Sequence, residues 1–131
     1  IFGYTIGNDI SARDVQYRHG QYFLGKSLDG TCPLGPYLVS KDEIPDPQNL
    51  SIVTKVNGEI RQNSSTKHMM FPVADIISIV SQYVTLEPGD IILTGTPEGV
   101  GKGMNPPQYL KAGDEVKVSI EGIGTLANRF A

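Results

Sequence analysis

The sequence has a single cysteine, Cys32, and no apolar stretch long enough to cross a bilayer. One cysteine cannot form a disulfide within the chain, which is typical of proteins of the reducing cytoplasm. The longest apolar stretches, at residues 75–80 and 90–95, are far shorter than the roughly 20 residues of a membrane-spanning helix. No signal-peptide pattern is visible. We therefore expect a cytoplasmic protein without a membrane partner.

Charged residues are also scarce, at 19% of the chain. The 14 acidic residues outnumber the 11 Lys and Arg, which gives a formal net charge of −3, and the basic residues form no run. Binding to a phosphate backbone needs a basic face. The composition therefore argues against nucleic acid as a partner and favours a small molecule or another protein.

Glycine and proline, by contrast, are plentiful, with 15 Gly and 9 Pro in 131 residues. This content is typical of short strands joined by tight turns. We expect a mainly β fold with one clear helix, in the α+β class, forming a single domain over residues 1–131. The chain begins without Met and already in the apolar alternation of a strand over residues 1–6. We therefore expect it to be the C-terminal part of a longer protein.

Two stretches give the clearest local predictions. Asn57-Gly58 divides two alternating runs over residues 51–65, and a type I′ hairpin turn needs the positive φ angles that Asn-Gly adopts at low cost. Apolar residues over residues 73–84 recur at the i, i+3, i+4, i+7 spacing of one helical face, with Pro72 near the start. Residues 33–40 predict a further strand, and residues 41–50, with two prolines, predict a surface loop.

Residues 86–90 and 110–114 share the pattern Leu-x-x-Gly-Asp, each followed by β-branched residues. The pattern predicts a turn that feeds a strand in both places. Between them lies a Gly- and Pro-rich stretch, residues 94–109, which is too long for an ordinary hairpin connection. Long loops of this kind often carry function.

The stretch from Asp9 to Gln16 concentrates polar groups near the start of the chain. Asp9 can supply one carboxylate ligand to a hard cation such as Mg²⁺, while Arg13 and Gln16 can bind a substrate carboxylate. The alternative is structural: Asp9 or Asp14 caps a helix, and Arg13 pairs with one of them at the surface. The residue types alone leave both interpretations open and favour the second.

Two later stretches carry weaker signals. Lys26, after a glycine in an aromatic setting, can stabilise a developing oxyanion, or its stem can pack while its ammonium reaches solvent. Gly95 and Thr96 offer backbone N–H groups and a hydroxyl to an anionic group, or form an ordinary turn. We predict surface positions for His19 and His68, and for Cys32 a small buried side chain rather than a nucleophile.

Five blocks occur together and in order, at residues 3–16, 24–36, 56–66, 86–101 and 110–130. They begin with "GYTIGNDISARDVQ" and include "LGKSLDGTCPLGP", "VNGEIRQNSST" and "LEPGDIILTGTPEGVG". In this arrangement the chain closely resembles the C-terminal domain of the fumarylacetoacetate hydrolase family. The resemblance covers essentially the whole chain.

The resemblance implies a mixed β-sandwich roll, a homodimer, and a Mg²⁺ or Mn²⁺ ion held by three carboxylates. Asp9 matches the metal-binding aspartate. Arg13 and Gln16 match substrate-binding residues. Lys26 and Thr96 match residues that bind substrate and take part in catalysis, with Gly95 beside them in the substrate site. Thr31 is the nearest match to a threonine that assists near the metal.

This sequence departs from the family pattern because it contains no Glu-x-Glu motif, which supplies the other two carboxylates upstream of the Asp9 block. The histidine and glutamate that family members carry on an upstream lid have no match either. With Asp9 alone, we expect tight metal binding to fail.

The resemblance implies a metal-dependent enzyme that acts on short 2-oxo or 1,3-dicarbonyl dicarboxylic acids through an enolate. The blocks are most similar to the branch of acylpyruvases, oxaloacetate decarboxylases and hydroxyheptadienedioate isomerase-like proteins, which favours a C–C hydrolase or decarboxylase. The first alternative is the 2-hydroxyhepta-2,4-diene-1,7-dioate isomerase of aromatic catabolism. The second, motivated by the missing glutamates, is a non-catalytic scaffold.

Overall fold

The computed structural model describes the backbone of residues 1–131 and the side chains of all of them except His19, so the predicted surface position of His19 lies outside the described residues. In chain order the elements are β1 (Gly3–Gly7), α1 (Arg13–His19), α2 (Phe23–Lys26), β2 (Leu34–Ser40), η1 (Lys41–Glu43), β3 (Ser51–Val56), β4 (Glu59–Ser65), η2 (Thr66–His68), α3 (Val73–Val80), η3 (Gly101–Gly103), β5 (Glu115–Ile120) and β6 (Gly124–Arg129).

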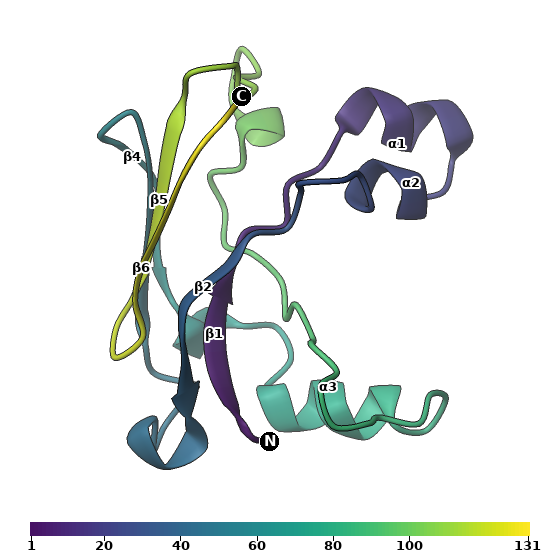
Figure 1. The fold of residues 1–131 in the computed structure, drawn as a ribbon, viewed down its shortest axis with the longest axis vertical. Coiled ribbons are helices and arrows are strands. Elements are labelled where there is room, and N and C mark those ends of the chain that lie inside the picture. Colours follow the sequence, from purple (N-terminus) through teal and green to yellow (C-terminus); the bar gives the residue numbers. More distant parts are fainter.

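The strands form two antiparallel sheets. β1 pairs with β2, and a four-stranded sheet has the order β4-β3-β5-β6. β2 packs against β6, while β1 contacts β5 and β6. In Figure 1 the α1–α2 pair and α3 project on the side of β1 that faces away from the four-stranded sheet. The α+β class is confirmed, with the two short helices α1 and α2 in addition to the one that the sequence predicts.

The core lies where the two sheets meet. Its buried side chains come from β1, from the segment after η1, and from the β5–β6 hairpin: Ile6, Ile44, Val116, Val118, Ile123 and Leu126. Ile44 is only 4% exposed, although it falls in the stretch that the prolines mark as a surface loop. Lys41–Glu43 form the short helix η1 and the rest of the stretch is a loop as predicted, but the Ile44 side chain joins the core between the two sheets.

The β3–β4 hairpin confirms the prediction from Asn57-Gly58. Asn57 has φ 51° and Gly58 has φ 86°, as a type I′ turn requires, and Val56 lies opposite Glu59. The Asn57 side chain also donates to Asp114 Oδ1 (2.9 Å) and accepts from the Glu115 backbone N–H (2.9 Å). The turn residue therefore ties the hairpin to the start of β5.

Helix α3 begins where the sequence predicts it, with Pro72 as its N-cap residue, but it ends at Val80. The chain continues through tighter turns, in which the Gln82 and Tyr83 N–H groups donate to Ile79 O and Val80 O. Helices in proteins gain most of their stability from packing. Val84, the last residue of the predicted apolar face, is 57% exposed, so extending the helix to this residue would gain little stability from burial.

The prediction of two turn-and-strand units is half right. The turn at residues 110–114 leads into β5, which pairs with β3 and β6. The turn at residues 86–90 forms as well, but residues 91–97 are not a strand. Ile91 is 60% exposed and Leu93 is 43% exposed. Among the described residues no strand pairs with this segment, so its β-branched residues have no ladder to join.

No helix in the described part of the chain has the length and apolar character needed to cross a membrane.

Candidate active site

The predicted site residues come together at one broad open groove of about 2060 Å³. Side chains from many parts of the chain line it, among them the segment that joins β1 to α1, the end of α2, strands β3 and β4, and the 94–109 loop. Five predicted residues are among them, namely Asp9, Arg13, Lys26, Gly95 and Thr96, and Thr31 lines the groove as well. Gln16 does not line it, since this residue is buried and only 2% exposed.

Helices α1 and α2 pack closely because Gly25 has no side chain. The Ala12 N–H donates to Gly25 O (2.8 Å), and the Gln16 N–H donates to Ala12 O (3.1 Å). A Cβ on Gly25 would lie 2.9 Å from Ala12 O, which is too close, and 3.1 Å from Gln16 Cβ, which is tighter than an ordinary contact. The glycine therefore allows the close approach that places the next residue, Lys26, beside the β1–α1 segment.

Lys26 and Asp9 form an ion pair through Nζ and Oδ2. Their side chains are 35% and 39% exposed, so the pair stands at the groove surface. The helix-capping interpretation is wrong for both Asp9 and Asp14, because the N-cap residue of α1 is Ala12 and no described side chain caps this helix; Asp14 lies in its first turn. Lys26 likewise does more than reach solvent, since its charge meets a specific carboxylate.

Arg13 is held by Gln16. Arg13 Nη1 donates to Gln16 Oε1 (2.9 Å), across one turn of α1. Gln16 Nε2 is buried and has no hydrogen-bond partner among the side chains that the structure describes. Gln16 therefore orients Arg13 at the groove wall through its amide oxygen.

Thr96 is fixed by a residue that the sequence interpretation did not single out. Gln62 Nε2, on β4, donates to Thr96 Oγ1 (2.9 Å) and to Pro97 O (2.8 Å). Gly95 adopts φ 116°, a backbone conformation that favours glycine. Gln62 lies within "VNGEIRQNSST", one of the five blocks that carry the family resemblance, and this membership could have pointed to it.

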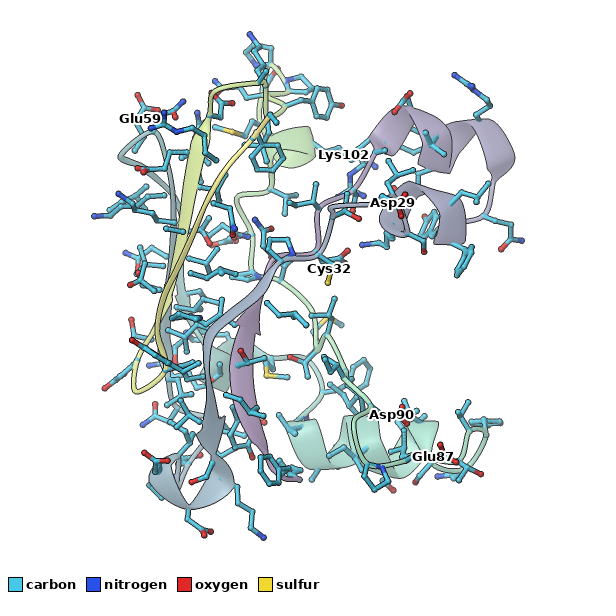
Figure 2. All side chains as sticks on the ribbon, in the orientation of Figure 1. Asp29, Cys32, Glu59, Glu87, Asp90 and Lys102 are labelled. Carbon is cyan, nitrogen blue, oxygen red and sulfur yellow. The ribbon has the colours of Figure 1, made fainter. Side chains whose placement is uncertain are left out.

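The 94–109 loop lies directly against β4 at a second point. A Cβ on Gly99 would lie 1.9 Å from Arg61 O, so only glycine fits there. Arg61 Nη1 donates to the Gln108 side-chain carbonyl, which fastens the far end of the loop to the same strand. Lys102 Nζ lies 4.8 Å from the ring centroid of Tyr17 on α1. Figure 2 shows Lys102 on the side of η3 that faces this helix.

The described side chains do not form a metal centre by themselves: no group of three or more His, Cys, Asp or Glu comes together among them. The Thr31 hydroxyl donates to Leu28 O (2.6 Å). Exposed His68 lines the groove, and half-buried Cys32 does not. Asp9 is thus a candidate for one metal ligand, and it already has a counter-ion in Lys26.

The carboxyl groups of Asp114 and Glu115 have lowered pKa values, and both residues lie near the β3–β4 turn. The Asn57 side-chain amide, and next the Lys111 backbone N–H, hold the pKa of Asp114 below its ordinary value. The hydrogen bond from Lys117 lowers the pKa of Glu115. These shifts belong to the framework of the β5 end rather than to the Asp9–Lys26 pair.

Among curated proteins, the chain is 55% identical over 130 residues to the oxaloacetate tautomerase YisK of Bacillus subtilis. The matched region covers 99% of this chain and 43% of that protein. An uncharacterized protein of Staphylococcus epidermidis is 60% identical over 126 residues, or 96% of this chain and 42% of its own length. The chain thus spans less than half the length of these relatives.

Two solved structures superpose closely. A fumarylacetoacetate hydrolase from Exiguobacterium antarcticum has a TM-score of 0.96 at 56% identity, covering 98% of this chain and 46% of that one. The 2-hydroxyhepta-2,4-diene-1,7-dioate isomerase from Mycobacterium marinum has a TM-score of 0.89 at 44% identity, covering 100% and 48%. Residues 1–131 match the family described as fumarylacetoacetate (FAA) hydrolase C-terminal. The chain belongs to the fumarylacetoacetate hydrolase family.

Proposed function

We propose that the whole protein is an enzyme that interconverts the keto and enol forms of short 2-oxo dicarboxylic acids such as oxaloacetate. The observation that carries the proposal is the shared groove, in which the Asp9–Lys26 pair, Arg13 and Thr96 all present polar groups. The B. subtilis relative named an oxaloacetate tautomerase, 55% identical, supports this substrate class. C–C hydrolysis and decarboxylation pass through the same enolate and are the competing reactions.

Each side chain has a proposed task that its chemistry allows. Arg13, oriented by Gln16, holds a substrate carboxylate with its planar fork. Lys26 brings a positive charge to the oxygen that becomes negative when the α-proton leaves. Thr96 donates its hydroxyl hydrogen to an anionic oxygen of the substrate. Together these groups bind a dianionic ligand and stabilise its enolate form.

We propose Asp9 as one carboxylate ligand of Mg²⁺ or Mn²⁺ in the whole protein. A divalent cation there would supply Lewis-acid stabilisation of an enolate. The described residues alone do not fit a tightly held cation, because Asp9 is a single carboxylate paired with Lys26. We expect calorimetric titration of residues 1–131 with MgCl₂ to give no submillimolar binding. Submillimolar binding would show that Asp9 and its neighbours suffice.

The second candidate is isomerisation of an unsaturated dicarboxylate. The M. marinum structure, with a TM-score of 0.89, is named a 2-hydroxyhepta-2,4-diene-1,7-dioate isomerase. This reaction also moves a proton through an enol, so the same side chains serve it. The two candidates are separated by assaying both substrates with the full-length protein.

The proposed tautomerase activity is tested by replacing Lys26. We expect Lys26→Met in the full-length protein to lower the rate of oxaloacetate ketonisation, followed by enol absorbance, by about 100-fold or more. Lys41→Met is the matched control, because Lys41 is exposed in η1 and does not line the groove. A Lys26→Met protein with the wild-type rate would contradict the proposal.

We also propose a homodimer. Large apolar side chains stay exposed in residues 1–131, among them Phe2 (80%), Phe23 (74%) and Tyr83 (82%). Exposed apolar area of this kind is typical of interaction surfaces. Light scattering of the full-length protein distinguishes a dimer from a monomer.

A further inference from the structure

Gln62 makes two hydrogen bonds from one nitrogen. Its Nε2 donates to Thr96 Oγ1 at 2.9 Å and to Pro97 O at 2.8 Å. Gln62 lies on β4 opposite Thr54, is half-buried, and lines the same groove as Thr96. The amide therefore connects a strand of the four-stranded sheet to the loop that carries Thr96.

The Pro97 carbonyl decides which way the amide faces. A carbonyl oxygen only accepts hydrogen bonds, so the Gln62 atom beside it has to be the NH₂ group and not the amide oxygen. That NH₂ group has two hydrogens, and the two acceptors use both of them. Thr96 Oγ1 is consequently an acceptor in its bond with Gln62.

This polarity determines what the Thr96 hydroxyl can offer to a ligand. A hydroxyl has one hydrogen and two lone pairs. Gln62 already donates to the oxygen, and no described residue accepts the hydroxyl hydrogen, so this hydrogen can meet an acceptor on a ligand; Thr96 is exposed on the groove. The arrangement suits an anionic oxygen as the ligand atom that meets Thr96.

We propose that Gln62 is a positioning residue that makes the Thr96 hydroxyl a hydrogen-bond donor to an anionic oxygen of the bound oxo acid. The proposal rests on the proposed function for its ligand class. The loop also touches β4 at Gly99, whose Cβ would lie 3.2 Å from Gln62 Cγ. Arg61, beside Gln62 on β4, also donates to Gln108, so the loop keeps a second attachment to β4 when the amide is removed.

The test reverses the polarity with little change in shape. In Gln62→Glu a carboxylate accepts only, so it captures the Thr96 hydroxyl hydrogen and repels Pro97 O. Loss of one oxyanion donor costs about 100- to 1000-fold in kcat, and we expect Gln62→Glu to lose about 10- to 100-fold. We expect the loss in kcat rather than in KM, because the donor meets charge that develops during the reaction. We expect a small drop in the thermal midpoint as well, because the hydrogen bond to Pro97 O is lost.

The control variant and a double-mutant cycle of Gln62 and Thr96 are both measured on the full-length protein with oxaloacetate as substrate. Gln82→Glu adds the same charge on the exposed turn after α3, outside the groove, and should leave kcat within about twofold. The double variant Gln62→Glu/Thr96→Val should be no slower than Thr96→Val alone, because both changes remove the same donor. Multiplying losses, or a Gln62→Glu protein with wild-type kcat, would overturn the assignment.

Oxalate binding, measured by calorimetry, separates this inference from the proposed function. Wild-type protein that binds oxalate without turning over oxaloacetate contradicts the tautomerase proposal alone. Oxalate carries next to a carboxylate the negative oxygen that the oxo acid acquires only as its enolate, so in that case the Gln62 assignment is supported if Gln62→Glu weakens oxalate binding and Gln82→Glu does not. Wild-type protein that neither binds oxalate nor turns over oxaloacetate overturns both.

Discussion

The turns at residues 86–90 and 110–114 are built alike and lead to different structures. In the first, the Glu87 N–H donates to Asp90 Oδ2 (2.8 Å) and the Asp90 N–H donates to Glu87 O (3.1 Å). In the second, Lys111 and Asp114 make the same two bonds, at 2.8 Å and 3.0 Å. After the first turn the chain runs unpaired to Gly95 and Thr96, whereas after the second it becomes β5.

The difference shows which level of structure decides each outcome. The five-residue pattern suffices for the turn, because its hydrogen bonds are local. Whether the β-branched residues that follow form a strand depends on a neighbour: β5 has β3 on one side and β6 on the other. The unpaired segment is free to follow the groove, and it is the one that carries the proposed catalytic threonine.

The largest effect should come from replacing a threonine by valine, once in the unpaired segment after the first turn and once in the sheet that contains β5. We expect Thr96→Val to lower kcat for oxaloacetate ketonisation by about 100-fold or more in the full-length protein, since it removes a donor to an anionic oxygen. Thr125→Val, on β6, removes a hydroxyl that shares a hydrogen bond with Ser119 Oγ (2.8 Å) and should leave kcat within about twofold. Equal losses would end the division between a functional and a structural segment.

The next largest effect concerns stability. Val118 on β5 is only 7% exposed, so Val118→Ala should lower the free energy of unfolding by about 2 kcal/mol through lost burial and a small cavity. Ile91→Ala, after the first turn, removes a larger side chain that is 60% exposed, and its effect should stay within about 0.5 kcal/mol. Urea denaturation of both variants measures the difference. A comparable loss at Ile91 would mean that residues 91–93 pack in solution as β5 does.

The smallest effect compares the two aspartates. Asp114 bonds Asn57 in addition to its own turn, so Asp114→Ala should lower the urea midpoint more than Asp90→Ala. The folded-state pKa of Asp114 lies below its ordinary value of 3.8. Its stabilising contribution is therefore present above that value and is lost as the pH falls through the folded-state pKa.

A pH series of unfolding midpoints, from about pH 5 to about pH 2, checks the sign. The wild type should lose stability more steeply than Asp114→Ala at the acid end. Parallel curves for the two proteins would contradict the Asn57–Asp114 hydrogen bond.

The sequence predicted the parts of the fold whose causes are local. Asn57-Gly58 carries its turn in its own backbone preferences, and Pro72 marks the start of α3. The end of α3 and the missing strand at residues 91–97 depend on packing partners that a periodic pattern does not contain. Ile44 is buried for the same reason, since its burial is decided by the sheets around it.

The candidate site divides in the same way. The residue types of Asp9, Arg13 and Lys26 suggested binding chemistry, but their selection as site residues came from the five ordered blocks. Their contacts required the fold, because Lys26 meets Asp9 across 17 positions of the chain. Gln62 lies 34 positions from Thr96, so no local sequence pattern predicts the hydrogen bond between their side chains.

Because Gly25 has no side chain, α1 and α2 can lie in direct backbone contact at this position. Any Cβ at this position would act as a wedge, since it would meet Ala12 O at 2.9 Å and Gln16 at 3.1 Å. The wedge would push Lys26 away from Asp9 while leaving both charges in place. The separation of the Lys26 and Asp9 charges at the groove thus depends on the size of the side chain at one uncharged position, the neighbour of Lys26 in the chain.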